Sequence, residues 1–223
     1  MDSYLIERLG HMGDGIARGP VFAPLTLPGE TVTGRLDGDR LNEVKIVTPA
    51  PERVAAPCRH FRTCGGCALQ HAAPEFIAGW KAGVVRQALA AQGIEAEIAA
   101  VHTSPERSRR RATLSARRTK KGALAGFHAR GSDVVVEIPD CHLLAPGLMA
   151  ALPVAEALAV AGGSRKGEIA VQATLSLGGL DIAVTGGKPM DGPLQVELAQ
   201  LAEGLGLARL AWDGEVVAMR HAP

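Results

Sequence analysis

Four cysteines are the residues of this sequence whose spacing most directly suggests chemistry. Cys58, Cys64 and Cys67 follow a C-x5-C-x2-C pattern, and Cys141 lies far along the chain. Two glycines between the second and third cysteines let the backbone turn tightly, so both thiolates can face one centre. Four thiolates suit either Zn²⁺ or an iron–sulfur cluster. Zinc ribbons usually carry two C-x2-C pairs, whereas this sequence has one pair and two single cysteines, so zinc, a cluster and unligated thiols all stay open.

The composition and the N-terminal residues indicate where such thiols would work. The chain has 223 residues, of which 47% are hydrophobic and 21% charged, the balance of a globular protein. Met1-Asp2-Ser3-Tyr4 lacks the basic and apolar regions of a secretory signal, and no apolar run approaches the about 18 residues of a membrane helix. We therefore expect a cytoplasmic protein that does not span a membrane, in which cysteines serve metals or catalysis more often than disulfides.

A one-sided cluster of basic residues lies in the middle of the chain, although the totals of 24 basic and 23 acidic residues nearly balance. Residues 107–131 hold nine arginines and lysines and no acid. Such a cluster suggests a polyanionic partner, because arginine and lysine release counterions when they neutralise phosphates. A solvated basic face is the alternative. The candidate contacts are Arg109, Arg110, Arg111, Arg117, Arg118, Lys120 and Lys121.

These basic residues alternate with small apolar ones, as is typical of an extended strand. The first face has an apolar centre that can pack on a core, whereas the second is entirely polar. We therefore expect the second face to be exposed and to contact phosphates. The first face comprises Arg110, Ala112, Leu114, Ala116 and Arg118, and the second comprises Arg109, Arg111, Thr113, Ser115 and Arg117.

Turn residues divide the chain into three predicted regions. Residues 1–50 contain short strands separated by Asp-Gly and Pro-Gly turns, which indicates a small barrel of the oligonucleotide-binding type. Residues 51–95 hold three cysteines and then a helix predicted from about Pro74 to Gln92. Residues 96–223 form the third region. Its order of hairpins, helix and hairpin is typical of an α+β fold rather than of a doubly wound sheet.

The third region begins with the basic strand and turns at Lys120-Lys121-Gly122. Further strands are predicted at 134–138, at 169–176 and 181–185, which flank a Gly-Gly turn, and at 208–219 around Asp213-Gly214. A helix is predicted at 197–204.

The cysteine motif and its surroundings resemble the RNA (uracil-5-)-methyltransferases, especially the branch that acts on 23S ribosomal RNA. The matching run is Cys58-x5-Cys64-Gly-Gly-Cys67-x2-Gln70-His71, with Cys141 downstream. The segments 13–17 (Gly-Asp-Gly-Ile-Ala) and 27–30 (Leu-Pro-Gly-Glu) are similar to the family's N-terminal TRAM domain, an RNA-binding barrel. Arg109-Arg110-Arg111-Ala112-x-Leu114 and Gly126-Phe127 are similar to its central domain, and the resemblance is strongest over residues 11–144.

The resemblance implies that Cys58, Cys64, Cys67 and Cys141 hold a structural [4Fe-4S] cluster. It also implies RNA as the partner and S-adenosylmethionine as the methyl donor of the full-length enzyme. The family binds that donor through a glycine-rich loop between a strand and a helix, and no such loop is found in these 223 residues. The family's nucleophile is a cysteine, whereas all four cysteines here match cluster ligands. We therefore expect the S-adenosylmethionine-binding catalytic domain to be absent, with no catalytic residue in this chain and no activity of the chain alone.

The favoured interpretation is the RNA-recognition portion of a monomeric, cytoplasmic 23S rRNA (uracil-5-)-methyltransferase, which makes 5-methyluridine. One alternative is a stand-alone zinc-bearing RNA-binding module, which metal analysis would distinguish. The other is a transfer RNA (uracil-5-)-methyltransferase of the same family, which sequencing of crosslinked RNA would distinguish.

Overall fold

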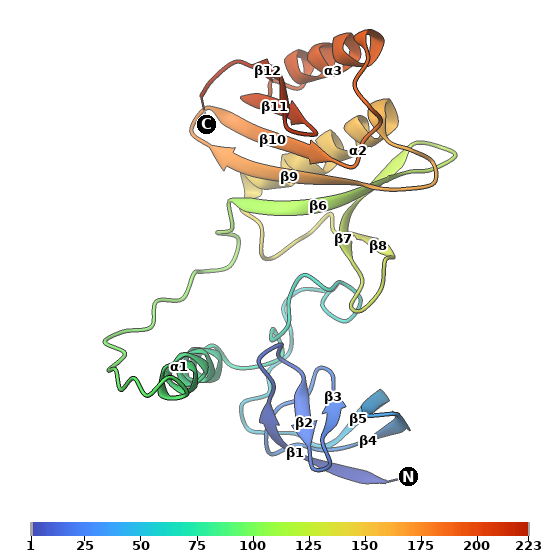
Figure 1. Cartoon of the computed structure of the whole chain (residues 1–223). Helices are drawn as coiled ribbons and strands as arrows, with labels where there is room; N and C mark the ends of the chain where they lie inside the picture. The colour runs from blue at the N-terminus through green and yellow to red at the C-terminus, as the bar shows by residue number, and fades with distance from the viewer. Residues whose placement is uncertain (1, 223) are drawn as a thin grey trace. The chain divides into compact units, whose positions relative to one another are not determined.

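The computed structural model describes residues 2–222, and its chain divides into two compact units. The barrel unit comprises Met1–Arg59 and Cys67–Thr103. The sheet unit comprises His60–Gly66 and Ser104–Pro223. Figure 1 shows the elements of each unit along the chain. No helix within residues 2–222 is long and apolar enough to cross a membrane.

The barrel unit is built around a closed barrel of five strands, which confirms the N-terminal barrel predicted from the turn spacing. The strands follow the order β1-β2-β3-β5-β4, and the β3–β5 pair is parallel. The interior is filled by apolar side chains that are fully buried or nearly so, among them Ile6, Val32 and Leu41. The strands are β1 (Ser3–Leu9), β2 (Gly15–Ala17), β3 (Val21–Ala23), β4 (Thr31–Asp37) and β5 (Arg40–Thr48).

A second apolar cluster joins one end of the barrel to the helix α1 (Pro74–Ala90). Leu9 and Leu27 of the barrel region pack with Leu69, and Phe76 and Trp80 of α1 lie against this cluster. Pro74 stands in the first turn of the helix, where the missing N–H of proline costs nothing. The helix ends two residues before the predicted Gln92, in a turn of residues 91–93.

A buried ion pair lies beside this cluster in the barrel unit. The carboxylate of Glu30 is fully buried, and the guanidinium of Arg53 binds it in bidentate fashion through Nε to Oε1 and through Nη2 to Oε2, the latter at 2.8 Å. The backbone N–H groups of Leu27 and Ala50 donate to the same carboxylate at 2.8 and 3.2 Å. Arg53 also donates to the carbonyl oxygen of Leu25 at 2.8 Å. This network ties the turn before β4 to the segment that follows β5.

The sheet unit contains a seven-stranded mixed sheet with the order β12-β11-β10-β9-β6-β7-β8. All neighbouring strands are antiparallel except β10 and β11, which run parallel. Together with the barrel this sheet confirms the predicted α+β class. The strands are β6 (Arg111–Arg118), β7 (Ala123–His128), β8 (Val135–Glu137), β9 (Ile169–Ser176), β10 (Gly179–Thr185), β11 (Arg209–Trp212) and β12 (Glu215–Met219).

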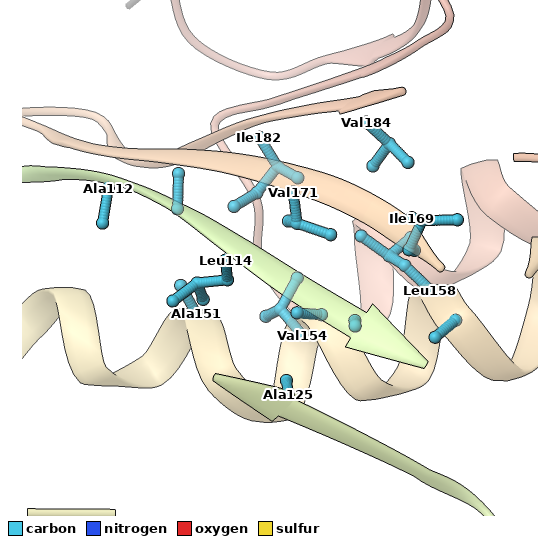
Figure 2. Packing of buried hydrophobic residues seen from close by; sticks show 14 of the residues in the cluster. Ala112, Leu114, Ala125, Ala151, Val154, Leu158, Ile169, Val171, Ile182 and Val184 are labelled. Carbon is cyan, nitrogen blue, oxygen red and sulfur yellow. The ribbon is translucent and has the colours of Figure 1, made fainter. Parts of the chain in front are cut away.

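Helices pack on one face of this sheet. A 3₁₀ helix, η1 (Pro146–Ala150), leads directly into α2 (Ala151–Gly162), which packs on β6, β7 and β9. The helix α3 (Gly192–Gly204) contacts α2, β11 and β12. Figure 2 shows Leu114 of β6 close to Ala151 and Val154 of α2. Strands β7, β9 and β10 contribute further core residues, among them Ala125, Val171 and Ile182.

Two of these helices differ from the sequence prediction. The helix α3 begins at Gly192 rather than Glu197, because the Asp191 side chain accepts a hydrogen bond from the Leu194 N–H at 2.8 Å and caps the first turn. The helix α2 was not predicted at all. Its apolar residues occupy most positions, and Pro153 stands inside it, so the sequence has no clear polar face to indicate a helix.

Candidate nucleic-acid interface and cysteine ligands

The basic strand β6 lies inside the sheet, between β9 and β7, and its two faces differ as the alternation predicted. Ala112, Leu114 and Ala116 are buried beneath α2. Arg111 and Arg117 belong to the opposite face and are exposed. We call this the open face, meaning the face of the sheet opposite α2 and α3. It therefore presents basic side chains from the middle of a rigid sheet.

Small and polar side chains from neighbouring strands share the open face with β6. Strand pairing places Thr174 beside Arg111 and Gln172 beside Thr113. The next strand places Asp181 beside Thr174. All of these neighbours are shorter than arginine, so the guanidinium groups of β6 can reach beyond them. No large aromatic side chain belongs to these register pairs, and the surface is therefore suited to charge and hydrogen bonding rather than to base stacking.

The remaining predicted contacts flank β6. Arg109 and Arg110 precede the strand and are exposed. The backbone of Arg109 is held in place, because its N–H donates to the Leu143 carbonyl at 3.1 Å and its carbonyl accepts from the Ala145 N–H at 2.9 Å. Of the seven predicted basic side chains, Arg118 at the end of β6 is half-buried. The other six are exposed: Arg109, Arg110, Arg111, Arg117, Lys120 and Lys121.

Three arginines on the open face have partners within the sheet unit, and the first two are Arg111 and Arg209. Arg111 Nε donates to Thr174 Oγ1 at 3.2 Å. Arg209 on β11 was not predicted as a site residue, and it forms a bidentate pair with Asp181, with distances of 2.7 Å from Nε to Oδ1 and 2.9 Å from Nη2 to Oδ2. Hydrogen bonding to that carboxylate raises the pKa of the Arg209 guanidinium. The pair neutralises Arg209, whereas the Thr174 hydroxyl leaves the charge of Arg111 on β6 uncompensated.

Arg117 belongs to a second polar group that sequence reasoning missed. Its Nη2 atom lies 3.4 Å from Glu168 Oε2. The His128 ring atom Nε2 lies 2.9 Å from Oε1 and 3.1 Å from Oε2 of the same carboxylate. All three side chains are partly exposed. The sequence signal for this group is one acidic residue, Glu168, just before β9. That residue can be matched to Arg117 only when the pairing of β9 with β6 is known.

Two of the predicted ligands lie in the barrel unit. Cys58 is buried, and its backbone N–H donates to the Gln70 side-chain oxygen at 3.3 Å. Cys67 is half-buried. Close to it, Ala68 and Leu69 pack against Gly13, where an added Cβ would lie 3.1 Å from the Ala68 side chain. The residues after Cys67 therefore pack on the barrel, and Gln70 of that segment binds the backbone of Cys58.

The other two predicted ligands lie in the sheet unit. Cys64 and Cys141 are both buried and belong to the same apolar cluster. Cys64 forms an isolated β-bridge with Ala129, directly after β7, and the Gly66 N–H lies 3.4 Å from its Sγ atom. All four cysteines are thiols rather than disulfides. Across residues 2–222, no three or more His, Cys, Asp or Glu side chains form a group that could hold a metal ion.

The glycines between Cys64 and Cys67 let the loop lie directly on β7. The Gly65 N–H donates to the His128 carbonyl at 2.8 Å, and an added Cβ on Gly65 would lie 2.9 Å from that oxygen. A Cβ on Gly66 would lie 3.0 Å from the Phe127 ring. Larger residues would therefore push the Cys64 loop away from the sheet, which is a second reason for glycine here beside the tight turn.

Comparison with known proteins identifies the class to which these features correspond. No protein-family model matches the chain. An RNA methyltransferase from Caulobacter vibrioides is 42% identical over 228 residues, which cover 97% of this chain and 55% of that protein. The chain is therefore homologous to RNA methyltransferases, which confirms the resemblance found in the sequence. Nearly all of this chain is matched, but it spans only about half the length of these curated relatives.

Two further matches are named as methyltransferases that act on C5 of uracil. A 23S rRNA (uracil(1939)-C(5))-methyltransferase from Halomonas elongata is 38% identical over 160 residues, covering 66% of this chain and 33% of that protein. The crystal structure of the Pyrococcus abyssi tRNA (uracil-54, C5)-methyltransferase, solved with S-adenosyl-L-homocysteine, has a TM-score of 0.62 at 19% identity, over 94% of this chain and 50% of that chain. At that identity the structural match concerns the fold alone.

Proposed function

We propose that this chain is the RNA-recognition portion of an S-adenosylmethionine-dependent RNA (uracil-5-)-methyltransferase that forms 5-methyluridine in 23S ribosomal RNA. The observation that carries the proposal is the open face of the sheet, on which exposed arginines project from β6. Homology to RNA methyltransferases supports RNA as the polyanion that this face binds. The N-terminal barrel supports a second, TRAM-like contact with the same RNA. As an enzyme of ribosomal RNA it would work in the cytoplasm.

The proposal includes a structural [4Fe-4S] cluster held by Cys58, Cys64, Cys67 and Cys141. The donor set fits the group, because four thiolates are the usual ligands of such clusters. Burial of Cys58, Cys64 and Cys141 fits it as well, since a cluster needs protection from solvent and oxidants. When bound, the cluster would supply cross-linking of its four ligand segments. Methyl transfer itself would depend on S-adenosylmethionine and on a catalytic domain of the full-length enzyme.

The open face should provide most of the electrostatic affinity for RNA. Replacing Arg109, Arg111 and Arg117 together by alanine removes three exposed guanidinium groups from the open face and its edge. For single-stranded RNA each phosphate contact contributes about 0.7 to the slope of log K against log salt concentration, so the loss of three contacts should flatten the slope by about two units. Base preference should hardly change, because phosphate contacts position the RNA and base contacts specify it. Fluorescence anisotropy titrations between 50 and 300 mM salt, which span about a sixfold range, would measure the slope.

A matched control removes the same charge elsewhere. Arg86, Lys188 and Arg220 are exposed and lie outside the basic cluster of residues 107–131. Their triple alanine variant should keep the parent's slope to within about half a unit. If the open-face variant and this control bind a ribosomal RNA fragment as the parent does, the face is only a solvated basic surface. The barrel would then be the better RNA contact.

The substrate class can be tested with crosslinked RNA. Ultraviolet crosslinking of the 223-residue chain in a total bacterial RNA extract, followed by sequencing, should recover one region of 23S rRNA. Recovery should depend on the open-face arginines, because they supply the proposed phosphate contacts. Dominant recovery of transfer RNA would favour the tRNA (uracil-5-)-methyltransferase alternative. Recovery of no RNA above a sample without irradiation would contradict RNA recognition altogether.

A further inference from the structure

One carboxylate on the sheet unit is bound by two side chains that could equally bind a phosphate. Glu168 accepts from His128 Nε2 at 2.9 and 3.1 Å through its two oxygens, and Arg117 Nη2 lies 3.4 Å from Oε2. A carboxylate can only accept, so the His128 Nε2 atom carries a hydrogen and points it at the anion. Arg117 and His128 therefore already present N–H donors around one negatively charged group.

We propose that Arg117 and His128 form a phosphate-binding site for the RNA backbone, in which the Glu168 carboxylate is the resident competitor. This inference rests on the proposed function. It assigns a role to His128 and Glu168, which are not among the predicted RNA contacts. A phosphodiester has the same charge as a carboxylate and offers oxygens to the same donors. Binding of RNA then means that one anion replaces another, with Glu168 turning out into solvent.

The energetics of the three side chains permit this exchange. The Arg117 and Glu168 side chains are 45% and 29% exposed, and His128 is 38% exposed. Ion pairs between side chains as exposed as these are weak, so a phosphate can displace the carboxylate at small cost. The displaced carboxylate stays close to the bound phosphate and repels it. Glu168 therefore lowers the affinity for every RNA whose backbone occupies this site, and its removal should raise that affinity.

The position of the site on the sheet supports this role over a purely structural one. Ala116 pairs with Ile169, so Glu168 and Arg117 are next to each other at the end of the β6–β9 pairing. The strands are already held there by their backbone hydrogen bonds and by the buried cluster beneath them. A clasp between exposed side chains adds little to such a pair. The same side chains stand on the open face, where the RNA backbone is proposed to lie.

The test is a double-mutant cycle on RNA affinity. We expect Glu168→Gln to bind a fluorescein-labelled 20-nucleotide single-stranded RNA about two- to fivefold more tightly than the parent at 50 mM salt. Arg117→Ala should weaken binding and flatten the salt slope by about 0.7 unit. In the Arg117→Ala background the gain from Glu168→Gln should fall to less than half, because the competed arginine is gone. His128→Ala should reduce the same gain.

A control separates local competition from overall charge. Glu197 is exposed on α3, in the helical layer, so Glu197→Gln makes the same change of net charge away from the open face. Its affinity should stay within about 1.5-fold of the parent. Thermal denaturation should give the same midpoint for Glu168→Gln and the parent, whereas a structural clasp would predict a lower midpoint and weaker binding.

The outcomes distinguish this inference from the proposed function. Suppose that the parent binds RNA, that Arg117→Ala lowers the affinity, and that Glu168→Gln has the same affinity as Glu197→Gln. The competitor role of Glu168 is then wrong, and RNA recognition stands. The same conclusion follows if the gain persists undiminished without Arg117. If the parent chain does not bind RNA at all, both the proposed function and this inference are overturned.

Discussion

Serine in place of Cys64 or Cys141 should abolish assembly of the proposed cluster. Protein purified without oxygen should be brown, with broad absorption near about 400 nm from charge transfer between thiolate and iron. Each variant removes one thiolate ligand, and a serine hydroxyl is a poor replacement for it. We expect iron to fall from about four atoms per chain to near zero, together with the loss of the absorption band. Iron and sulfide analysis with the visible spectrum provide the measurement.

The expected loss has a matched control in the same segment. Ala129 forms a β-bridge with Cys64, so Ala129→Ser adds a hydroxyl beside the ligand without removing a thiol. This variant should keep its iron and its colour. The outcome that contradicts the cluster is stoichiometric zinc without iron in the parent, which would favour the zinc-bearing alternative. Full iron content in both cysteine variants would show that these thiols are not ligands.

A second large effect is expected from the buried ion pair of the barrel unit. Glu30→Gln keeps the size of the side chain and removes its charge, so the mostly buried guanidinium of Arg53 loses its counter-ion. Breaking one partner of a buried, hydrogen-bonded pair typically costs about 3 kcal/mol or more of unfolding free energy. Urea denaturation followed by circular dichroism should show this as a lower midpoint.

The pH dependence of the barrel should have the same origin. Burial alone would raise the pKa of Glu30, but hydrogen bonds from Arg53 and from the backbone N–H groups of Leu27 and Ala50 outweigh it and lower the pKa below its usual value of 4.5. Because the pKa is lower in the folded state, the stabilisation is complete above about pH 4.5 and is lost as the pH falls through the folded-state pKa. Glu30→Gln should remove this part of the acid sensitivity.

The control for Glu30 is an ion pair of the same type in the same barrel. Arg35 and Glu43 lie 3.3 Å apart, with side chains that are 70% and 72% exposed. Glu43→Gln should change the unfolding free energy by less than about 0.5 kcal/mol, because exposed pairs contribute little. Equal effects of Glu30→Gln and Glu43→Gln would show that burial of the Glu30–Arg53 pair adds nothing to its contribution to stability.

The elements with a strong local pattern were predicted from the sequence. The barrel strands are separated by turn residues, and α1 starts at a proline, so both were found close to their observed bounds. The two faces of β6 were also predicted, because a period of two with alanine and leucine on one side and arginine on the other has only one way to bury its apolar half. In each case neighbouring residues along the chain contain the whole signal.

The elements without such a pattern were missed. Helix α2 is apolar on most sides, and its buried residues are small, such as Ala151, Ala155 and Ala159. A helix of this kind is recognised by what it packs against, because the sheet above it selects which apolar residues are buried. The start of α3 was missed for a different reason, since its capping aspartate stands before a Gly-Pro pair that reads as a turn.

The sequence by itself determined the kinds of chemistry available to this protein: four thiols in a ligand-like spacing, a basic strand with one polar face, and a barrel. Residue type and short-range spacing are enough for these features, because each depends on neighbours within a few positions. Only the tertiary structure decided which charges meet. Glu168 reaches Arg117 and His128, Asp181 reaches Arg209, and Glu30 reaches Arg53. These partners lie 23 to 51 residues apart in the sequence. Strand register and chain packing bring them together, and no pattern of neighbouring residues predicts such a pairing.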